Sequence, residues 1–150
     1  MNYGFTPDIV TTAKGLGGGL PIGACMLGEK VENVYSYGDH GSTFGGNPVA
    51  CAGAINILSR ITDELMSDVC KKSKLIFDTL CNAEGVVSVT GMGLMIGIET
   101  KKDASEIVTV CRENGLLVLK AKNKISLLPP LNITDEQVSE ALEIITKAFI

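Results

Sequence analysis

The stretch DIVTTAKGLGGGLPIGACML, residues 8–27, decides the fold. Its apolar beginning at 8–13 predicts a short buried strand that runs into Lys14. The glycine-rich residues 15–19 then turn the chain, and a second strand is expected at 22–27. The first feature to explain is therefore a lysine at the end of a strand, directly before a glycine turn.

Lys14 allows two interpretations. A lysine at a strand end is commonly a solvated surface residue. Alternatively, an apolar pocket would desolvate the amine, and the small residues on both sides would leave room for a flat ring. Desolvation lowers the pKa of a lysine and lets it form a Schiff base with a carbonyl group. Residues 8–27 by themselves leave both interpretations open.

A second group of polar residues lies in the segment GDHGSTFGGNP, residues 38–48. Ser42 and Thr43 place two adjacent hydroxyl groups, together with free backbone amides, just before a helix that Asn47-Pro48 should start. Such donors beside a helix N-terminus can bind an anion. An ordinary capped loop has the same composition, so the segment alone does not decide between the two.

Glycine and charge are unevenly distributed along the chain. Twelve of the 17 glycines lie in the first 53 residues, which hold only Lys14 and Lys30 of the 13 basic residues. We therefore expect this part to contain strands from the middle of a parallel sheet, packed inside something larger. Apolar residues at helical spacing from Val49 to Val69, continuing after a break or bend to Leu80, predict the connection to the remainder.

The remainder, residues 86–150, predicts a small α+β unit in the order ββαββα. Thr134 and Gln137 have the spacing of a capping box at the start of the last helix. The strands are expected at 86–90, 94–99, 116–119 and 125–128, and the helices at 104–114 and from 134 onward.

The composition excludes several classes of protein. The 150 residues are 45% hydrophobic and can bury a core, and the net charge of −4 argues against a nucleic-acid partner or an anionic membrane. The uncharged, apolar stretch 15–28 is too short and glycine-rich to span a membrane, and we expect no secretory signal. The five cysteines have no C-x-x-C pair, which argues against a zinc site and predicts reduced thiols in the cytoplasm.

Several motifs together resemble those of the class III aminotransferases, which depend on pyridoxal 5'-phosphate. The resemblance rests on TTAKGLGGG at 11–19, PIGA at 21–24 and HGSTFGGNP at 40–48. With GLMIGIE at 93–99 and LLPPLNIT at 127–134, the motifs are most similar to the acetylornithine branch of that class. The resemblance runs over essentially the whole chain, and it favours the cofactor-binding interpretation of the strand-end lysine.

The resemblance implies a fold and a reaction. The fold would be α/β, a pyridoxal-phosphate-dependent transferase of fold type I. Residues 1–50 would end the large cofactor-binding domain, 51–85 would form a connecting helix region, and 86–150 would form the small C-terminal α+β domain. The reaction would transfer an amino group between N-acetylornithine and 2-oxoglutarate, in arginine biosynthesis. A cytoplasmic homodimer, with each site shared across the interface, is implied as well.

The resemblance also implies roles for three residues. Lys14 would hold pyridoxal 5'-phosphate as a Schiff base and move the proton between the substrate α-carbon and the cofactor. Thr43 would reach across the dimer interface to the cofactor phosphate, and Ser42 would contact the substrate.

Two positions depart from the family pattern. Arginine is usual in the family before the LLPPL segment and before the Gly-x-Gly-Leu segment, whereas this chain has Ser126 and Thr90 there. A hydroxyl group cannot replace a guanidinium fork that holds a carboxylate at two points. Another class III activity, on ornithine, succinylornithine or 4-aminobutyrate, therefore stays open.

The chain also begins close to the lysine that would carry the cofactor. By resemblance, an upstream half would supply the phosphate loop, the aromatic residue that stacks on the ring, and the aspartate that pairs with the pyridine nitrogen. A third hypothesis follows, that of a catalytically inactive fragment that folds and self-associates. In that case residues 86–150 would fold. The strand edges and apolar side chains of residues 1–50 would lack partners.

Overall fold

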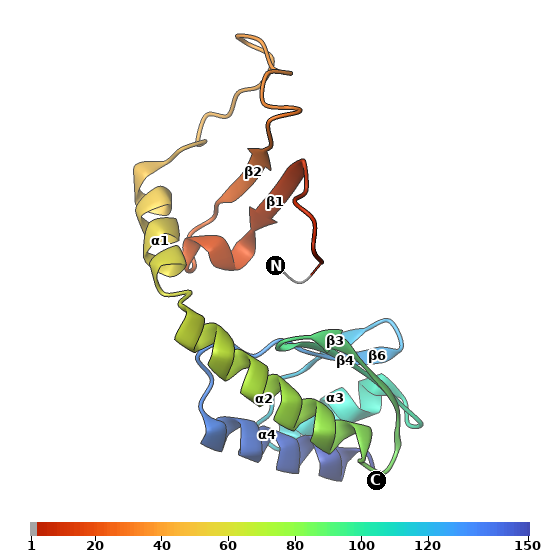
Figure 1. The fold of residues 1–150 in the computed structure, drawn as a ribbon. Coiled ribbons are helices and arrows are strands. Elements are labelled where there is room, and N and C mark those ends of the chain that lie inside the picture. Colours follow the sequence, from red (N-terminus) through yellow and green to blue (C-terminus); the bar gives the residue numbers. More distant parts are fainter. Residues whose placement is uncertain (1–2) are drawn as a thin grey trace. The chain divides into compact units, whose positions relative to one another are not determined.

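The computed structural model describes residues 3–150 (Figure 1). The chain divides into two compact units, Met1–Thr62 and Asp63–Ile150, which are called unit 1 and unit 2 below. The finer division into 1–50, 51–85 and 86–150 stays a prediction.

Unit 1 is built on a two-stranded antiparallel ribbon. Strand β1 (Ile9–Ala13) pairs with β2 (Gly23–Leu27), from Ile9 opposite Leu27 to Ala13 opposite Gly23. A short 3-10 helix, η1 (Lys14–Gly17), and the glycine turn after it join the two strands. The two strands and the turn between them are therefore where the sequence predicts them.

The expectation of a buried strand from a parallel sheet is wrong for β1. The strand is antiparallel to β2, and the Ile9 side chain is 55% exposed. The pairing is antiparallel because the short connection over residues 14–22 cannot make the crossover of about a dozen or more residues that a parallel pair needs. The exposure follows from the small size of the ribbon. With two strands, each strand keeps an unpaired edge, and the residues of both strands remain exposed or half-buried.

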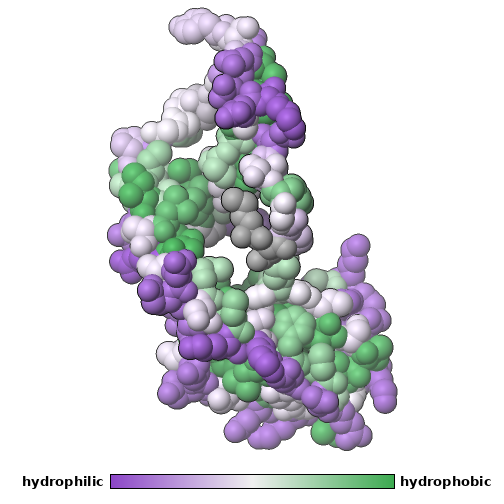
Figure 2. All heavy atoms as spheres, in the orientation of Figure 1, coloured by the Kyte–Doolittle hydropathy of each residue, from purple (hydrophilic) through white to green (hydrophobic). Residues whose placement is uncertain are grey.

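Helix α1 (Pro48–Ser59) begins as the sequence predicts. The Asn47 side-chain oxygen accepts hydrogen bonds from the amides of Val49 at 3.0 Å and Ala50 at 3.1 Å, and Pro48 occupies the first turn. The buried residues of α1 are Ala50 and Ala54, both small. Figure 2 shows hydrophobic atoms on the surface over α1. Much of the apolar surface of α1 is therefore uncovered within the described chain.

Unit 2 combines one more helix with the ββαββα order predicted for 86–150. Its four strands form one antiparallel sheet in the order β3-β4-β6-β5. Helices α2, α3 and α4 cover one face of this sheet (Figure 1). The elements are α2 (Asp63–Cys81), β3 (Val86–Met92), β4 (Met95–Thr100), α3 (Ala104–Glu113), β5 (Leu119–Ala121), β6 (Lys124–Leu127) and α4 (Asp135–Ala148).

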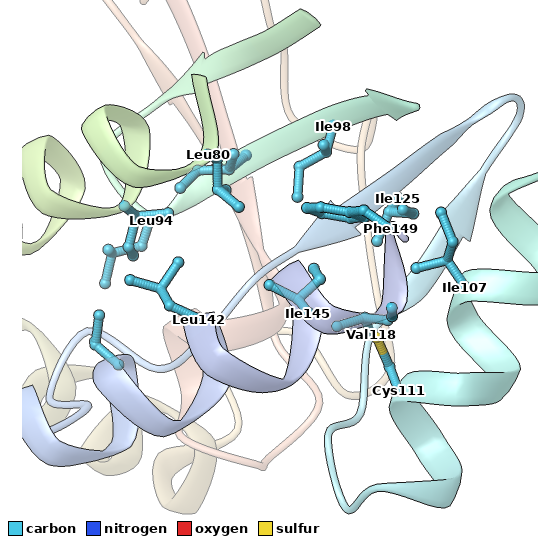
Figure 3. Close-up of a cluster of buried hydrophobic side chains, with 14 of the residues drawn as sticks. Leu80, Leu94, Ile98, Ile107, Cys111, Val118, Ile125, Leu142, Ile145 and Phe149 are labelled. Carbon is cyan, nitrogen blue, oxygen red and sulfur yellow. The ribbon is translucent and has the colours of Figure 1, made fainter. Parts of the chain in front are cut away.

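The core of unit 2 lies between the sheet and the three helices (Figure 3). Alternate strand residues point into it, so Ile96, Ile98 and Ile125 are at most 1% exposed. The opposite face of the sheet, called the outer face below, carries Thr90, Gly97, Glu99, Lys124 and Ser126. The helices contribute Leu80, Ile107, Cys111, Val138, Leu142 and Ile145.

The start of α4 is fixed by a capping box and by an ionic contact with α2. The Thr134 hydroxyl accepts from the Gln137 amide at 3.2 Å, and the Gln137 side chain accepts from the Thr134 amide at 3.0 Å, which confirms the predicted helix start. Lys72 of α2 is buried, pairs with Asp68, and lies 3.9 Å from the Asp135 carboxylate. The aliphatic part of the Lys72 side chain is buried, and its ammonium group lies near the carboxylates of Asp68 and Asp135.

Candidate active site

Lys14 lies at the junction of β1 and η1, and its backbone is unusual. Its φ angle is +56°, in the left-handed region that non-glycine residues rarely adopt. Lys122, in the turn between β5 and β6, is the other described non-glycine residue with a positive φ. Such a conformation persists where surrounding structure holds it, and it concentrates at functional sites. Lys14 therefore occupies a position that the local fold imposes, and its side chain is exposed in this unit.

The turn that carries Lys14 is held by close backbone packing against α1. The Gly18 amide donates to the Gly15 carbonyl at 3.1 Å, with Gly18 at a φ of +61°. A Cβ atom on Gly18 would lie 2.9 Å from Cγ1 of Ile57, and one on Gly53 would lie 2.8 Å from the Gly17 carbonyl oxygen. Glycine at these positions lets the turn approach the helix closely.

Ser42 and the residues after it border a hollow of about 300 Å³ in unit 1. Its other wall is formed by Pro21, Ile22 and Gly23, at the start of β2. Because Gly23 pairs with Ala13, this hollow adjoins the ribbon end that precedes Lys14. The loop side is lined by Ser42, Phe44, Gly45, Gly46, Asn47 and Ala50.

Of the three predicted site residues, Ser42 alone lines this hollow. Neither Lys14 nor Thr43 belongs to the lining of the hollow. Thr43 is exposed, and its hydroxyl has no hydrogen-bond partner in the described chain. An exposed, unpartnered hydroxyl is free to bind a group from outside this chain.

Some of the backbone amides around the start of α1 are already hydrogen-bonded within the chain. The amides of Val49 and Ala50 are occupied by the Asn47 side chain, and the Gly45 and Asn47 amides bond within the turn. These four amides are therefore not available, whereas the amides of Ser42, Thr43, Phe44 and Gly46 have no partner in the described chain. The side-chain donors of the loop are the hydroxyl groups of Ser42 and Thr43, the His40 ring and the Asn47 NH2 group.

Between residues 3 and 150, no helix is long and apolar enough to cross a membrane, and no three His, Cys, Asp or Glu side chains are grouped to hold a metal ion. The five cysteines are free thiols. Burial raises the pKa of the Cys111 thiol, which lies in the core of unit 2.

Comparison with known protein families identifies the family of this chain. Residues 1–149 match the family Aminotransferase class-III. The chain belongs to this family. The acetylornithine aminotransferase of Haemophilus ducreyi is 44% identical over 99% of this chain and 38% of its own length. That of Corynebacterium efficiens is 44% identical over 95% of this chain and 36% of its own length. The chain thus spans well under half the length of these curated relatives.

Solved structures show the same relationship. The acetylornithine aminotransferase from Elizabethkingia anophelis superimposes with a TM-score of 0.88 at 34% identity, over 99% of this chain and 40% of that one. Ornithine aminotransferase PY00104 from Plasmodium yoelii gives a TM-score of 0.85 at 36% identity, over 99% of this chain and 42% of that one. The predicted fold type I is therefore confirmed, as is membership of a transaminase family that depends on pyridoxal 5'-phosphate.

The residues of unit 1 suit two functional groups of that cofactor. The primary amine of Lys14 suits the aldehyde carbon, and the hydroxyl group of Thr43 suits a phosphate oxygen. Both kinds of donor come from exposed positions, where a bound molecule can reach them.

The sequence analysis assigned no role to Lys124, which lies on the outer face of unit 2. Thr90 and Ser126, the two departures from the family pattern, lie in one cross-strand row on either side of Gly97. Lys124 reaches over this row, and its ammonium donates to the Thr90 hydroxyl at 3.2 Å. The signal was available, because Lys124 is two residues from Ser126 and must share its face of the strand.

Proposed function

We propose that the chain is the C-terminal portion of an aminotransferase that moves an amino group between N-acetylornithine and 2-oxoglutarate, in arginine biosynthesis. The observation that carries this proposal is the lysine at a φ of +56°, between a strand and a glycine turn. The 44% identity to relatives named acetylornithine aminotransferase supports this choice of substrate.

In this proposal each predicted site residue has a defined task. Lys14 binds the aldehyde carbon of the cofactor through Nζ and, once released, carries a proton to or from the substrate α-carbon. Pyridoxal 5'-phosphate, when bound, supplies a ring that stabilises negative charge at that carbon. Ser42 contacts the substrate, and Thr43 donates to the cofactor phosphate of a partner subunit. The protein would act as a cytoplasmic homodimer.

The first test is to locate the cofactor on the chain. The native protein that contains this chain is purified with pyridoxal 5'-phosphate, reduced with borohydride and mapped by peptide mass. We expect the added mass on the peptide that contains Lys14. Lys14→Ala should lose the label and all transamination, whereas Lys30→Ala should keep both, because Lys30 pairs with Asp8 at 3.1 Å on the surface. Label on a different lysine would refute the assignment.

The second test concerns Thr43. Thr43→Val should weaken cofactor affinity by about 1–3 kcal/mol, because a hydroxyl bonded to a phosphate is lost. Thr109→Val is the matched control, since its hydroxyl bonds to the Ser105 carbonyl on an exposed turn of α3. Equilibrium titration with the cofactor measures both. An unchanged affinity in Thr43→Val would remove this residue from the site.

A second candidate function is transamination of ornithine itself. It is favoured by the ornithine aminotransferase of Plasmodium yoelii, whose 36% identity is comparable with that of the solved acetylornithine aminotransferase. A panel of amino donors, comprising N-acetylornithine, succinylornithine, ornithine and 4-aminobutyrate, distinguishes the candidates. The highest kcat/KM on N-acetylornithine is expected, and a preference for another donor would replace it.

A further inference from the structure

A short hydrogen-bonded turn connects Lys14 to the residues that contact α1. Lys14 is the first residue of η1, and Gly17, its last residue, is buried. The Gly18 amide donates to the Gly15 carbonyl at 3.1 Å, and the Leu20 amide donates to the Gly17 carbonyl at 3.2 Å. Because these bonds close the turn, a displacement of Gly17 also displaces Lys14.

Helix α1 contacts the far end of this turn at Gly53. The turn η1 lies beside α1 (Figure 1). A Cβ atom on Gly53 would lie 2.8 Å from the Gly17 carbonyl oxygen and 3.2 Å from Cδ1 of Leu20. The first distance is shorter than real Cβ atoms essentially ever show, and the obstacle is backbone, which cannot rotate aside as a side chain can. A side chain at position 53 would therefore displace the turn or the helix.

A second contact lies one helical turn further along α1. Residues 53 and 57 are neighbours on the same face of the helix. The Ile57 side chain lies so close to Gly18 that a Cβ atom there would be 2.9 Å from Cγ1 of Ile57. The two contacts together hold the residues Gly17 and Gly18 against one face of α1.

Gly53 is unfavourable for the helix in which it lies. Glycine inside a helix destabilises it relative to alanine, because glycine loses more backbone freedom when the helix forms. The sequence of α1, PVACAGAINILS, is otherwise rich in alanine, and Gly53 is its one glycine. The close approach of the turn, and not the formation of the helix, accounts for a glycine at this position.

The Lys14 side chain has no polar contact that would hold it in place. Its ammonium makes no hydrogen bond or ion pair in the described chain, and the side chain is exposed. Its backbone has a φ of +56°, a conformation that persists where the surrounding structure holds it. The position of the amine therefore depends on the backbone, which is set by β1 on one side and by η1 on the other.

We propose that Gly53 is a positioning residue for Lys14. Because position 53 carries no side chain, α1 packs directly on Gly17 and holds the turn where the Lys14 amine can react. The proposal rests on the proposed function, which assigns this amine to the aldehyde carbon of the cofactor. Gly53 acts through Gly17 and needs no contact of its own with cofactor or substrate.

The test compares Gly53→Ala with Ala52→Ser in the native protein that contains this chain. Each variant adds one heavy atom to α1, at adjacent positions, and Ala52 is exposed in the described chain. Apoprotein is mixed with pyridoxal 5'-phosphate, and covalent attachment to Lys14 is followed by absorbance and by borohydride trapping. We expect Gly53→Ala to slow attachment about tenfold, because a displacement of less than an ångström misaligns the amine. Ala52→Ser should react at the unaltered rate.

Steady-state kinetics give a second readout, one that a purely structural role would not move. In Gly53→Ala, kcat per folded site should fall about tenfold, while KM for the amino donor changes less than about twofold. A role in helix stability alone predicts the opposite, since alanine favours the helix and would leave kcat per folded site unchanged.

Ile57→Ala provides a second variant in case Gly53→Ala does not fold. It removes the side-chain atoms next to Gly18 without adding a clash, and should slow attachment of the cofactor about threefold. Attachment at the unaltered rate in folded Gly53→Ala would overturn the proposal, as would equal losses in Gly53→Ala and Ala52→Ser. If Gly53→Ala does not fold, an unaltered rate in Ile57→Ala overturns it.

The same experiment separates this proposal from the proposed function. Borohydride trapping reports which lysine carries the cofactor. A label on another lysine refutes the proposed function, whereas a label on Lys14 that forms at the unaltered rate in the variants refutes only the positioning role of Gly53.

Discussion

The predicted site residues Lys14, Ser42 and Thr43 lie in unit 1, whereas nearly all of the buried hydrophobic residues lie in unit 2. The buried hydrophobic residues of unit 1 are Ala50 and Ala54, and all the others described lie in unit 2. The segment that holds Ser42 and Thr43 is exposed throughout, with Tyr37 and Phe44 at 108% and 83% exposure. A site built on so little buried surface depends on further contacts for its rigidity. Unit 2 has its own core and should need none to fold.

The largest expected effect is a difference between matched aliphatic truncations in the two units. Leu80→Ala should destabilise unit 2 by about 2–5 kcal/mol, because Leu80 is fully buried in the core and leaves a cavity. Ile55→Ala removes an aliphatic side chain from α1 that is 68% exposed, and should change stability by about 0.5 kcal/mol or less.

Urea unfolding, followed separately through amide signals of β4 and of α1, measures both variants. The proposed difference in packing between the two units is refuted if Ile55→Ala destabilises the chain as much as Leu80→Ala. That result would mean that α1 buries its outer face in the molecule as it exists in solution.

A smaller effect concerns the pH dependence of unit 2. Asp103 caps α3 by accepting from the Ser105 amide at 2.7 Å. Hydrogen bonds from the Ser105 side chain and amide, with help from the Lys120 charge, hold the pKa of this carboxyl below its ordinary value. A carboxyl with a lowered folded-state pKa stabilises the fold at neutral pH, and this contribution disappears as pH falls through that value, below about pH 4.

Asp103→Asn tests this directly, since asparagine can cap a helix without titrating. The variant should lose less stability than the unaltered chain between neutral pH and pH 3, as followed by urea midpoints of unit 2. An identical pH dependence in both proteins would show that the Asp103 carboxylate contributes nothing.

The sequence predicted most elements because local signals and packing agree in unit 2. The capping box at Thr134 and the alternation of Ile96 and Ile98 define α4 and β4 before any tertiary contact is known. The third strand was placed at 116–119, but pairing begins at Leu119. Leu116 and Val118 alternate like a strand because they pack on the core, although they have no strand partner.

The site was less predictable because its geometry depends on contacts that no local pattern encodes. The lysine before a glycine turn and the two loop hydroxyls were identified from their motifs. The left-handed backbone of Lys14 and the approach of Gly53 to Gly17 were not, and the second of these depends on packing of α1 on the turn. The position of Lys124 over Gly97 likewise required the strand register.

Hydrogen exchange on the 150-residue chain, combined with a mass measurement in solution, tests the contrast between the units most directly. We expect slow exchange across β4, β6 and α4, which contribute buried residues to the core, and fast exchange across Ile9–Thr43. Association of chains through unit 1 would protect that segment only in an oligomer, in keeping with its exposed apolar residues. Strong protection of Ile9–Thr43 in a monomer that also binds pyridoxal 5'-phosphate would contradict the account.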